Sequence, residues 1–185
     1  MRRILSRSTV VAVAIGLAFA SAGLYVGLKA SGNQPSMPRA SSGPVETLLA
    51  QQMTTPDGTV QSLSQWKNRK IVVNFWATWC APCVEEMPAL SAMQQALTPN
   101  TVQIIGIGID TPANIKAFTA RHGISYPIFV AGIAGTELMR QFGNKAGGLP
   151  YSVLIDGNGK IIRTYIGKLD MNALQRDITA LPPNT

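Results

Sequence analysis

The sequence is poor in thiols and in side chains that hold metals. Its 185 residues include two cysteines, Cys80 and Cys83, and a single histidine, His122. All thiol chemistry must therefore take place at these two cysteines. A zinc or copper site built on them would need His122 as a third ligand, because the sequence holds no other cluster of Cys and His. We therefore expect no metal and interpret His122 as a residue at a helix end.

The chain also lacks the basic stretches of a nucleic-acid-binding protein. Its formal net charge of +7 comes from 16 basic and 9 acidic residues. Four of the basic residues surround one apolar stretch near the N-terminus: Arg2, Arg3, Arg7 and Lys29. Removing these four leaves 12 basic against 9 acidic residues, a net charge of +3 for the rest. No run of Lys and Arg with interleaved aromatic residues occurs, so we expect no nucleic-acid partner.

One long apolar segment is present near the N-terminus. An uncharged stretch from Ser8 to Leu28 follows the arginines, and Lys29 ends it. About 20 apolar residues cross a bilayer as a helix, and the basic end is expected to stay in the cytoplasm. We therefore interpret residues 1–31 as a cytoplasmic basic end and a signal-anchor helix. The remainder of the chain then lies in the periplasm or outside a bacterial cell.

Cleavage of this segment is the alternative to an anchor. Ala18-Phe19-Ala20 and Ala20-Ser21-Ala22 both have the small-x-small pattern of a cleavage site, but the apolar run continues to Leu28. We favour the anchor that is not cleaved. No cysteine lies near the segment, which excludes a lipid-modified N-terminus.

Beyond the anchor, the composition predicts a linker and one domain. Residues 32–45 are interpreted as a flexible linker, because this part is rich in Ser, Gly and Pro and has no hydrophobic period. Residues 46–185 then form one domain of about 140 residues, enough for its own core. A hairpin is expected from the segments Leu48–Met53 and Thr59–Leu63. Further strands are expected at Lys70–Trp76, Val102–Ile109, Ile128–Val130, Tyr151–Asp156 and Lys160–Ile166, and helices at Cys83–Leu97, Pro112–His122, Gly135–Phe142 and Asp170–Leu181. This order predicts an α/β fold, a mixed sheet with helices on both faces.

The two cysteines lie where a strand ends and a helix begins, in the segment Trp79-Cys80-Ala81-Pro82-Cys83. A disulfide between them would close a small ring that stabilises a fold by only about 2 kcal/mol, against about 4.7 for a loop of 100 residues. The helix N-terminus instead favours a thiolate at Cys80, and Pro82 is tolerated in a first helical turn. We interpret the pair as a redox-active dithiol, with a structural disulfide and a metal site as alternatives.

The sequence around this pair resembles the thioredoxin superfamily. Residues 72–83 read VVNFWATWCAPC, and Glu86, Pro88 and Leu90 follow. Asp57-Gly58 and Leu63 before this motif, with Gly148-Leu149-Pro150 and residues 154–156 after it, narrow the resemblance to the membrane-anchored TlpA/ResA branch, which is related to the AhpC/TSA group. The resemblance covers about residues 46–180. It implies a thioredoxin-like fold with a central mixed β-sheet flanked by helices, an N-terminal β extension and an N-terminal transmembrane helix.

The resemblance also implies roles for individual residues. Cys80 would be the exposed attacking thiolate, and Cys83, one turn deeper, would resolve the mixed disulfide. Pro150 would be a cis-proline beside the pair, at the groove where the backbone of a partner protein docks. From the residues alone, a trans Pro150 that starts a strand remains the alternative. The predicted substrate-binding surface consists of Trp79, Pro82, Leu149 and Pro150, and Trp76 is interpreted either as a shield of the disulfide or as core.

One departure from thioredoxin concerns the proton of Cys83. Thioredoxins bury an aspartate under the cysteines, whereas this chain has Asn74, which cannot accept a proton. Glu86 lies three residues beyond Cys83 on the same helical face, and the TlpA/ResA branch has a glutamate there. A partly buried carboxyl has a raised pKa and could exchange protons near neutrality. The alternative is that Glu85 and Glu86 are acids favoured by the helix dipole.

These expectations combine into a tethered thiol–disulfide oxidoreductase. It would act without a cofactor other than the Cys80–Cys83 disulfide, as a monomer, on disulfides of exported proteins. The resemblance suggests reduction, for instance of apocytochrome c or of a copper-delivery protein for cytochrome oxidase, with a membrane thiol carrier of the DsbD/CcdA kind as electron donor. A Cu(I)-binding metallochaperone-like module and a general disulfide oxidant or isomerase are the alternatives. The residues between the cysteines do not fix the direction of electron transfer, since the reduction potentials of Cys-x-x-Cys proteins range from about −270 to −120 mV.

Overall fold

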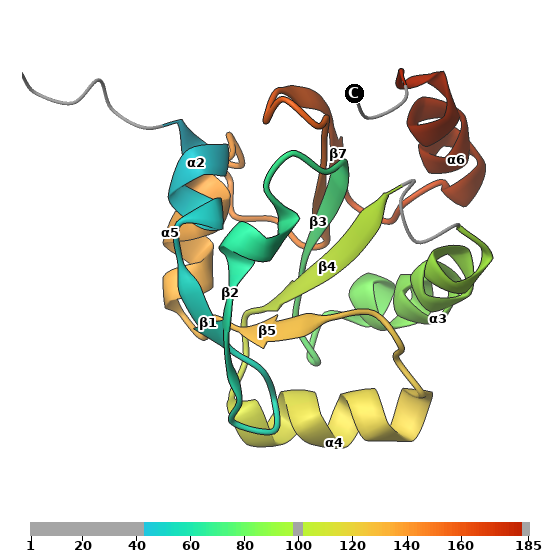
Figure 1. Cartoon of the computed structure of the whole chain (residues 1–185). Coiled ribbons are helices and arrows are strands. Elements are labelled where there is room, and N and C mark those ends of the chain that lie inside the picture. The colour runs from blue at the N-terminus through green and yellow to red at the C-terminus, as the bar shows by residue number, and fades with distance from the viewer. Residues whose placement is uncertain (1–42, 98–101, 183–185) are drawn as a thin grey trace, which may run out of the picture. The chain divides into compact units, whose positions relative to one another are not determined.

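The computed structural model describes residues 43–97 and 102–182, which Figure 1 shows as coloured ribbon. The predicted signal anchor, residues 1–31, and most of the predicted linker lie outside the described residues. Among the residues that the structure does describe, no helix combines the length and hydrophobicity that a bilayer span requires.

A mixed sheet forms the centre of the domain, with the strand order β2-β1-β5-β4-β3-β6-β7. The strands are β1 (Gln52–Thr54), β2 (Val60–Ser62), β3 (Ile71–Trp76), β4 (Gln103–Gly108), β5 (Ile128–Val130), β6 (Tyr151–Ile155) and β7 (Ile161–Ile166). Strands β3, β4 and β5 are parallel, and β6 runs antiparallel to β3. Every residue of β3 is buried, because helices cover both faces of the sheet at this central strand.

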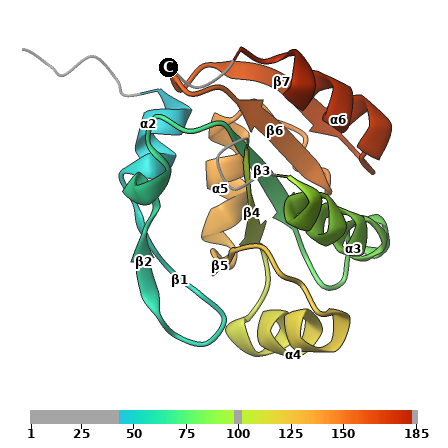
Figure 2. The same cartoon turned by 45° about the vertical axis from the view of Figure 1, so that its right-hand side comes forward.

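The helices divide the core into two layers, one on each face of the sheet (Figure 2). One face packs against α3 (Ala81–Ala96), α4 (Pro112–His122) and α6 (Met171–Ala180). The other packs against α2 (Pro44–Leu49), the 3-10 helix η2 (Leu63–Trp66) and α5 (Ala134–Gln141). Alternation along β3 directs Val73 and Phe75 to the α2 and α5 face, and Val72 and Trp76 to the α3 face.

Most predicted elements are confirmed, and α4 has the predicted bounds. Thr111 caps it, because its side-chain oxygen accepts a hydrogen bond from the Asn114 amide at 3.3 Å. The expected hairpin is present as β1 and β2, and β6 with β7 forms the other. The thioredoxin-like α/β architecture is therefore confirmed for the described residues.

The beginning of the domain differs from the prediction. The segment predicted as a strand from Leu48 is helical up to Leu49, and the strand begins only at Gln52. The helix already starts at Pro44, a residue that the composition assigns to the linker. Its buried residues Val45, Leu48 and Leu49 follow the i, i+3, i+4 spacing of a helix face. Leu63, predicted as the end of a strand, instead begins η2.

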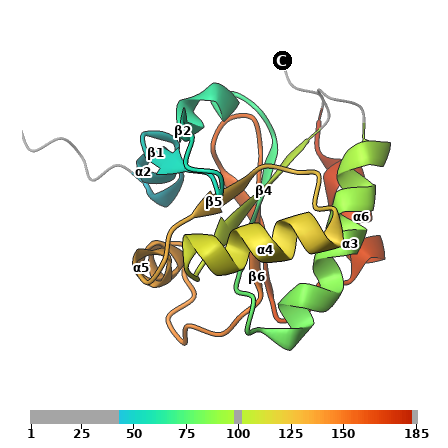
Figure 3. The same cartoon turned by 90° about the horizontal axis from the view of Figure 1, so that it is seen from below.

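The sheet places several loops at one edge. Strands β3, β4 and β5 all end there, and β6 begins there because it is antiparallel to β3. Phe75 near the end of β3 pairs with Tyr151 at the start of β6. The segment after β3, which carries the cysteines, therefore lies beside the segment before β6, which carries Pro150. Figure 3 shows the molecule from the side of this edge.

Candidate active site

The two cysteines form a disulfide at the N-terminus of α3. A bond of 2.04 Å joins Cys80, the N-cap residue, to Cys83 in the first turn. Cys80 keeps 6% of its surface exposed, and Cys83 none. The expectation of an exposed Cys80 is therefore wrong for this disulfide state, because Cys80 packs into the same hydrophobic cluster as Trp76 and Ala77. Cys80 is nevertheless the more accessible of the two cysteines.

The loop between β3 and Cys80 is anchored to the neighbouring loop after β4. The Thr78 hydroxyl donates a hydrogen bond to the Asp110 carboxylate, which also accepts bonds from the Thr111 amide and from Asn114. Burial acts to raise the pKa of Asp110, but these hydrogen bonds outweigh it and hold the pKa below its usual value. Asp110 therefore remains ionised near neutrality and ties the cysteine loop to the start of α4. The sequence analysis did not single out Asp110.

The residues predicted to bind substrate differ in accessibility. Trp79 is 68% exposed, Pro82 is exposed and Leu149 is half-buried, so all three present surface near the start of α3. Pro150 is buried, and the Leu149–Pro150 peptide bond is cis, the isomer that the resemblance implies. Trp76 is fully buried, with its ring centroid 5.1 Å from that of Phe118. Trp76 is therefore a core residue, in the same cluster as both cysteines, and it has no part in a docking surface.

A buried asparagine holds the loop that precedes Pro150. Asn144 is only 4% exposed, and its side-chain nitrogen donates to the Gly148 carbonyl at 2.7 Å. Its side-chain oxygen accepts from the Gly147 amide at 3.1 Å. Gly147 has a φ of +73°, a conformation that glycine adopts without steric cost. The sequence analysis missed Asn144, whose only signal was its place in a glycine-rich loop.

Glu86 lies on the buried face of α3 and is 1% exposed. Its Oε1 accepts a hydrogen bond from the Asn74 side-chain nitrogen at 2.9 Å, and its Oε2 accepts from the Leu169 amide at 2.8 Å. Burial raises the pKa of Glu86, and the hydrogen bonds from Leu169 and Asn74 and the charge of Lys168 offset only part of this effect. Because its pKa is raised toward neutral pH, the Glu86 carboxyl takes up a proton more easily than the carboxyl of a surface glutamate does. Glu85 differs, because it forms an exposed salt bridge with Lys168 at 2.6 Å.

Asn74 and Ser152 form a polar pair under α3. They are register partners on β3 and β6, and the Asn74 nitrogen donates to the Ser152 hydroxyl at 2.9 Å. Both are buried, at 0% and 1% exposure. Glu86, Asn74 and Ser152 thus form one hydrogen-bonded chain inside a mostly apolar layer. Ser152 was not predicted, because only the strand register places it beside Asn74.

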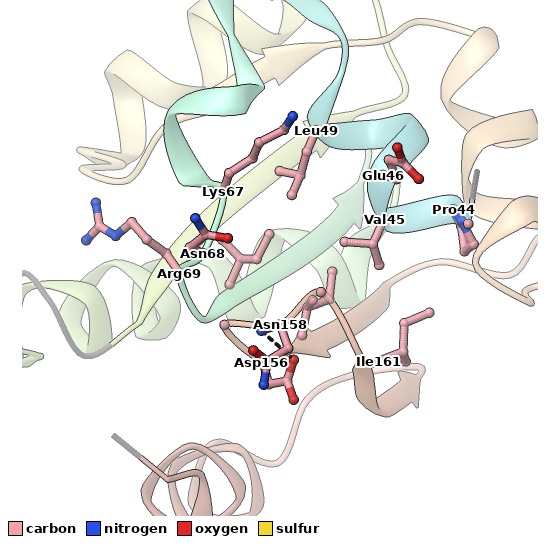
Figure 4. Close-up of a pocket in the computed structure, with 15 residues that line it drawn as sticks. Pro44, Val45, Glu46, Leu49, Lys67, Asn68, Arg69, Asp156, Asn158 and Ile161 are labelled. Carbon is pink, nitrogen blue, oxygen red and sulfur yellow. Dashed lines mark hydrogen bonds between the residues drawn. The ribbon is translucent and has the colours of Figure 1, made fainter. Parts of the chain in front are cut away.

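A cavity of about 470 Å³ lies at the other end of β3 (Figure 4). Its walls come from the start of α2, residues 67–69 and the β6–β7 turn. In Figure 4, Val45 and Leu49 lie toward this space, and the Arg69 head group points away from the other labelled side chains. The length of β3 separates it from the cysteines. Elsewhere within residues 43–97 and 102–182, no group of three or more His, Cys, Asp or Glu side chains is arranged to hold a metal ion.

Fold and site together define a class of protein, a thioredoxin-like domain with a disulfide of the Cys-x-x-Cys type at a helix N-terminus. Comparisons with known proteins agree with this class. The model of the redoxin family matches residues 32–178. The chain is 30% identical over 132 residues to the thiol-disulfide oxidoreductase ResA of Bacillus thuringiensis strain Al Hakam, covering 71% of this chain and 74% of the relative. It is 27% identical over 146 residues to the ResA of Geobacillus thermodenitrificans, covering 75% and 82%.

A solved structure gives the same result. The thioredoxin-related protein from Neisseria meningitidis serogroup B superposes with a TM-score of 0.62 at 35% identity, covering 69% of this chain and 96% of that one. The chain therefore belongs to the redoxin family, as a thiol–disulfide oxidoreductase of the ResA kind. Its activity is thiol–disulfide exchange, and the Cys80–Cys83 pair is the disulfide that the structure provides for it.

Proposed function

We propose that this chain is an extracytoplasmic reductant of disulfides in exported proteins, held at the bacterial cytoplasmic membrane by its N-terminal segment. The observation that carries the proposal is the disulfide between its two cysteines. It lies at the end of the sheet where β3 stops, beside the loop of Pro150. The apolar stretch from Ser8 to Leu28, with its basic N-terminal flank, supports the location. The likeness to the thiol-disulfide oxidoreductase ResA supports disulfide exchange, and the direction, reduction, is the one that the resemblance to the TlpA/ResA branch suggests. Apocytochrome c and copper-delivery proteins for cytochrome oxidase are the proposed substrates.

The reaction begins from the reduced pair. The Cys80 thiolate attacks one sulfur of the substrate disulfide and forms a mixed disulfide, and the other substrate sulfur leaves as a thiolate that takes a proton from water. The Cys83 thiol then loses its proton and attacks the sulfur of Cys80. The second substrate sulfur leaves and is protonated in turn. The substrate has gained two electrons and two protons, and the Cys80–Cys83 disulfide of the structure is restored.

Glu86 is the proposed acceptor of the Cys83 proton. The two residues lie one helical turn apart on the buried face of α3, and both are shielded from solvent. A carboxyl whose pKa is raised by burial can take the thiol proton and give it to the leaving thiolate within the same site. Asn74 occupies the place where a thioredoxin has an aspartate, so the proton passes to Glu86 instead.

The oxidised pair must be reduced again before a second turnover. A thiolate of an external donor attacks the pair, and Cys80, the more accessible cysteine, is the sulfur it reaches. Outside the cytoplasm the electrons must come across the membrane, so the proposed donor is a membrane thiol carrier of the DsbD/CcdA kind. The exposed side chains of Trp79 and Pro82 and the half-buried Leu149 form the proposed docking surface for both partners.

The proposal is tested by trapping substrates on Cys83→Ser in the full-length chain in bacterial membranes. Without the resolving thiol, Cys80 should remain linked to its substrate, and mass spectrometry of the thiol-sensitive adducts should identify exported proteins with paired cysteines. The double variant Cys80→Ser, Cys83→Ser is the matched control and should trap nothing. Adducts with cytoplasmic proteins only would contradict the location. A reduced protein that retains stoichiometric Cu(I), and loses it in Cys80→Ser, would favour the metallochaperone function.

A further inference from the structure

The hydrogen bonds of Glu86 suit only one of its two protonation states. Its two carboxyl oxygens accept from the Asn74 side-chain nitrogen and the Leu169 amide, and both of these groups are donors without acceptor capacity. An ionised carboxylate fits this arrangement. A protonated Glu86 carries an O–H that needs an acceptor, and a buried polar hydrogen left without one is costly. The proposed reaction requires both states, so the site must supply an acceptor when the proton arrives.

That acceptor is present on Asn74. The Asn74 Oδ1 is buried and has no hydrogen-bond partner among the described residues, while the nitrogen of the same amide serves both Glu86 and Ser152. The two ends of a side-chain amide have nearly the same size, so half a turn of the amide exchanges donor for acceptor with little change in packing. The carbonyl oxygen would then occupy the position that the nitrogen has in the structure.

We propose that Asn74 is a positioning residue whose side-chain amide makes this half-turn when Glu86 takes up a proton. The protonated Oε1 of Glu86 then donates to the Asn74 oxygen, and the Leu169 amide continues to donate to Oε2. No covalent bond changes, and one proton is added at Glu86. The half-turn itself does not rest on the proposed function. Its consequence does: Glu86 is held by hydrogen bonds both before and after it accepts the Cys83 proton.

Ser152 makes the exchange possible on the other side of the amide. Its hydroxyl can accept from the Asn74 nitrogen in one state and donate to the Asn74 oxygen in the other, because a hydroxyl has both capacities. The pairing of Asn74 with Ser152 across β3 and β6 fixes their separation in both states. A serine, unlike an alanine or a carboxylate, therefore permits either orientation of the amide at this position.

Other polar groups lie in the same layer. The Trp76 Nε1 and the Tyr126 hydroxyl are also buried without a hydrogen-bond partner in the part of the chain that the structure describes. The Trp76 and Tyr126 rings both lie beside Gly106, the register partner of Asn74 on β4, because a Cβ at this glycine would be 3.2 Å from both Trp76 Nε1 and Tyr126 Cε2. Neither group is hydrogen-bonded to Asn74 Oδ1, so a side chain of this layer must move before the turned Asn74 nitrogen finds an acceptor, and the Tyr126 hydroxyl is a group there that can accept.

Among the described residues, three groups around Glu86 could carry a charge, and one of them, Lys168, does so. From the loop before α6 there is Lys168, which is itself paired with Glu85. From the segment before β5 there is Tyr126, whose pKa is raised by burial and by the charge of Glu86, so that its hydroxyl stays neutral. From α3 itself there is Cys83, one turn away and without charge in the disulfide. In the disulfide form, Glu86 is therefore the group expected to titrate in this layer.

Nuclear magnetic resonance on the oxidised, isotope-labelled full-length chain in detergent micelles tests the proposal directly. The Glu86 carboxyl carbon should titrate, and the Asn74 side-chain amide resonances should move with the same midpoint. At low pH the amide protons of Asn74 should lose their contacts to Ser152 and gain contacts to Tyr126. Both changes should disappear in Glu86→Gln. Asn144 is an internal control, because it is a buried asparagine bonded to Gly148 rather than to an acid, and its resonances should stay constant.

A kinetic measurement provides the second readout. Asn74→Leu removes the donor that favours the carboxylate, and it should raise the pH midpoint of disulfide exchange by about one unit. Ser91→Ala, which removes a buried serine hydroxyl on α3 that is bonded to the Ser125 amide rather than to Asn74, should leave the midpoint unchanged. An Asn74 amide that keeps its contacts to Ser152 while Glu86 titrates would overturn the inference, even in an active enzyme. A protein without exchange activity would instead refute the proposed function and leave the resonance test valid.

Discussion

The two faces of the central sheet differ in the kind of side chain that they bury. At the centre of the sheet, the face covered by α2 and α5 buries Val73 and Phe75 from β3 and Val153 from β6. The face covered by α3 buries Asn74 and Ser152 at alternating positions of these same strands, with Glu86 above them. The first face maximises apolar contact, which stabilises the fold. The second gives up part of that contact to hold polar groups, among them the carboxyl that we propose as the proton acceptor of Cys83.

The unpartnered polar atoms follow the same division. Among the buried side chains that the structure describes, Asn74 Oδ1, Trp76 Nε1 and Tyr126 OH have no partner, and Trp76 and Tyr126 belong to the α3 layer. Buried polar atoms without partners destabilise a fold, so their concentration on one face is a cost that the other face offsets. The structure thus concentrates apolar contact on one side of the sheet and buried polar groups on the side that also carries the cysteines.

The largest effect on activity is expected from Cys80→Ser. The variant removes the attacking sulfur, so disulfide exchange with a small disulfide substrate should fall to the uncatalysed rate. The free energy of unfolding should fall by no more than about 2 kcal/mol, because this short-range disulfide constrains the unfolded chain by only that amount. Exchange above the level of a blank reaction would show that the cysteine site is not the sole site of chemistry.

The largest effect on stability is expected on the apolar face. Phe75→Ala removes a fully buried ring that lies 5.9 Å from Phe142 and 6.2 Å from Tyr151, and should cost about 3–5 kcal/mol in urea unfolding. Because Phe75 points away from Glu86, the pH profile of exchange by the folded fraction should match the wild type. A shifted profile would break the division between the faces.

An intermediate effect is expected from Gly106→Ala on the polar face. The added methyl group would lie 2.5 Å from Ile128 Cδ1 and 3.2 Å from both Trp76 Nε1 and a Tyr126 ring carbon. Overpacking of this kind should cost about 1–3 kcal/mol in urea unfolding. It should also displace Tyr126 and change the pH profile of exchange, in contrast to Phe75→Ala. A loss of stability with an unchanged profile would mean that this part of the layer is purely structural.

The smallest effect is expected from Glu86→Gln, and it depends on pH. Burial raises the pKa of Glu86 above its ordinary value of 4.5, so between that value and the folded pKa the native state binds more protons than the unfolded state. Wild-type stability should therefore fall as the pH rises through this window. The glutamine variant, which has no such group, should lose less over the same range in urea titrations at several pH values.

The same variant should also affect catalysis. Without Glu86 to exchange protons, the pH dependence of Cys80–Cys83 exchange should shift while the circular dichroism spectrum stays that of the wild type. Glu85→Gln is the matched control, because Glu85 is exposed and should leave the profile in place. An unchanged profile in Glu86→Gln would remove Glu86 from the proposed mechanism.

Several parts of the site were predictable because their signals are local. The apolar run before Trp79 and the spacing of the cysteines locate the end of β3 and the start of α3. The cap at Thr111 and the turn at Asp156 to Gly159 follow from the preferences of single residues. The helix α2 was not predicted, because Pro44 and Val45 were interpreted as linker and Leu48 and Leu49 as strand. Its three buried residues form a helix face only against the core of α5 and η2.

Residues that act through distant contacts could not be predicted. Ser152 joins Asn74 across 78 positions of the chain, and Leu169 reaches Glu86 across 83. Asp110 ties the cysteine loop to α4 through Thr78, 32 positions earlier. Each of these residues has an ordinary local interpretation, and only the tertiary structure brings it to the site.

By itself, the sequence determined where the chemistry takes place, because only two thiols exist and their spacing before a helix favours a reactive pair. It also determined the order of most strands and helices, since hydrophobic period and capping act over a few residues. The tertiary structure decided the environment of that pair: the burial of Cys80, the enclosure of Glu86 and the orientation of Asn74. Burial and hydrogen bonding depend on segments that only folding brings together, and they control how easily a proton can move.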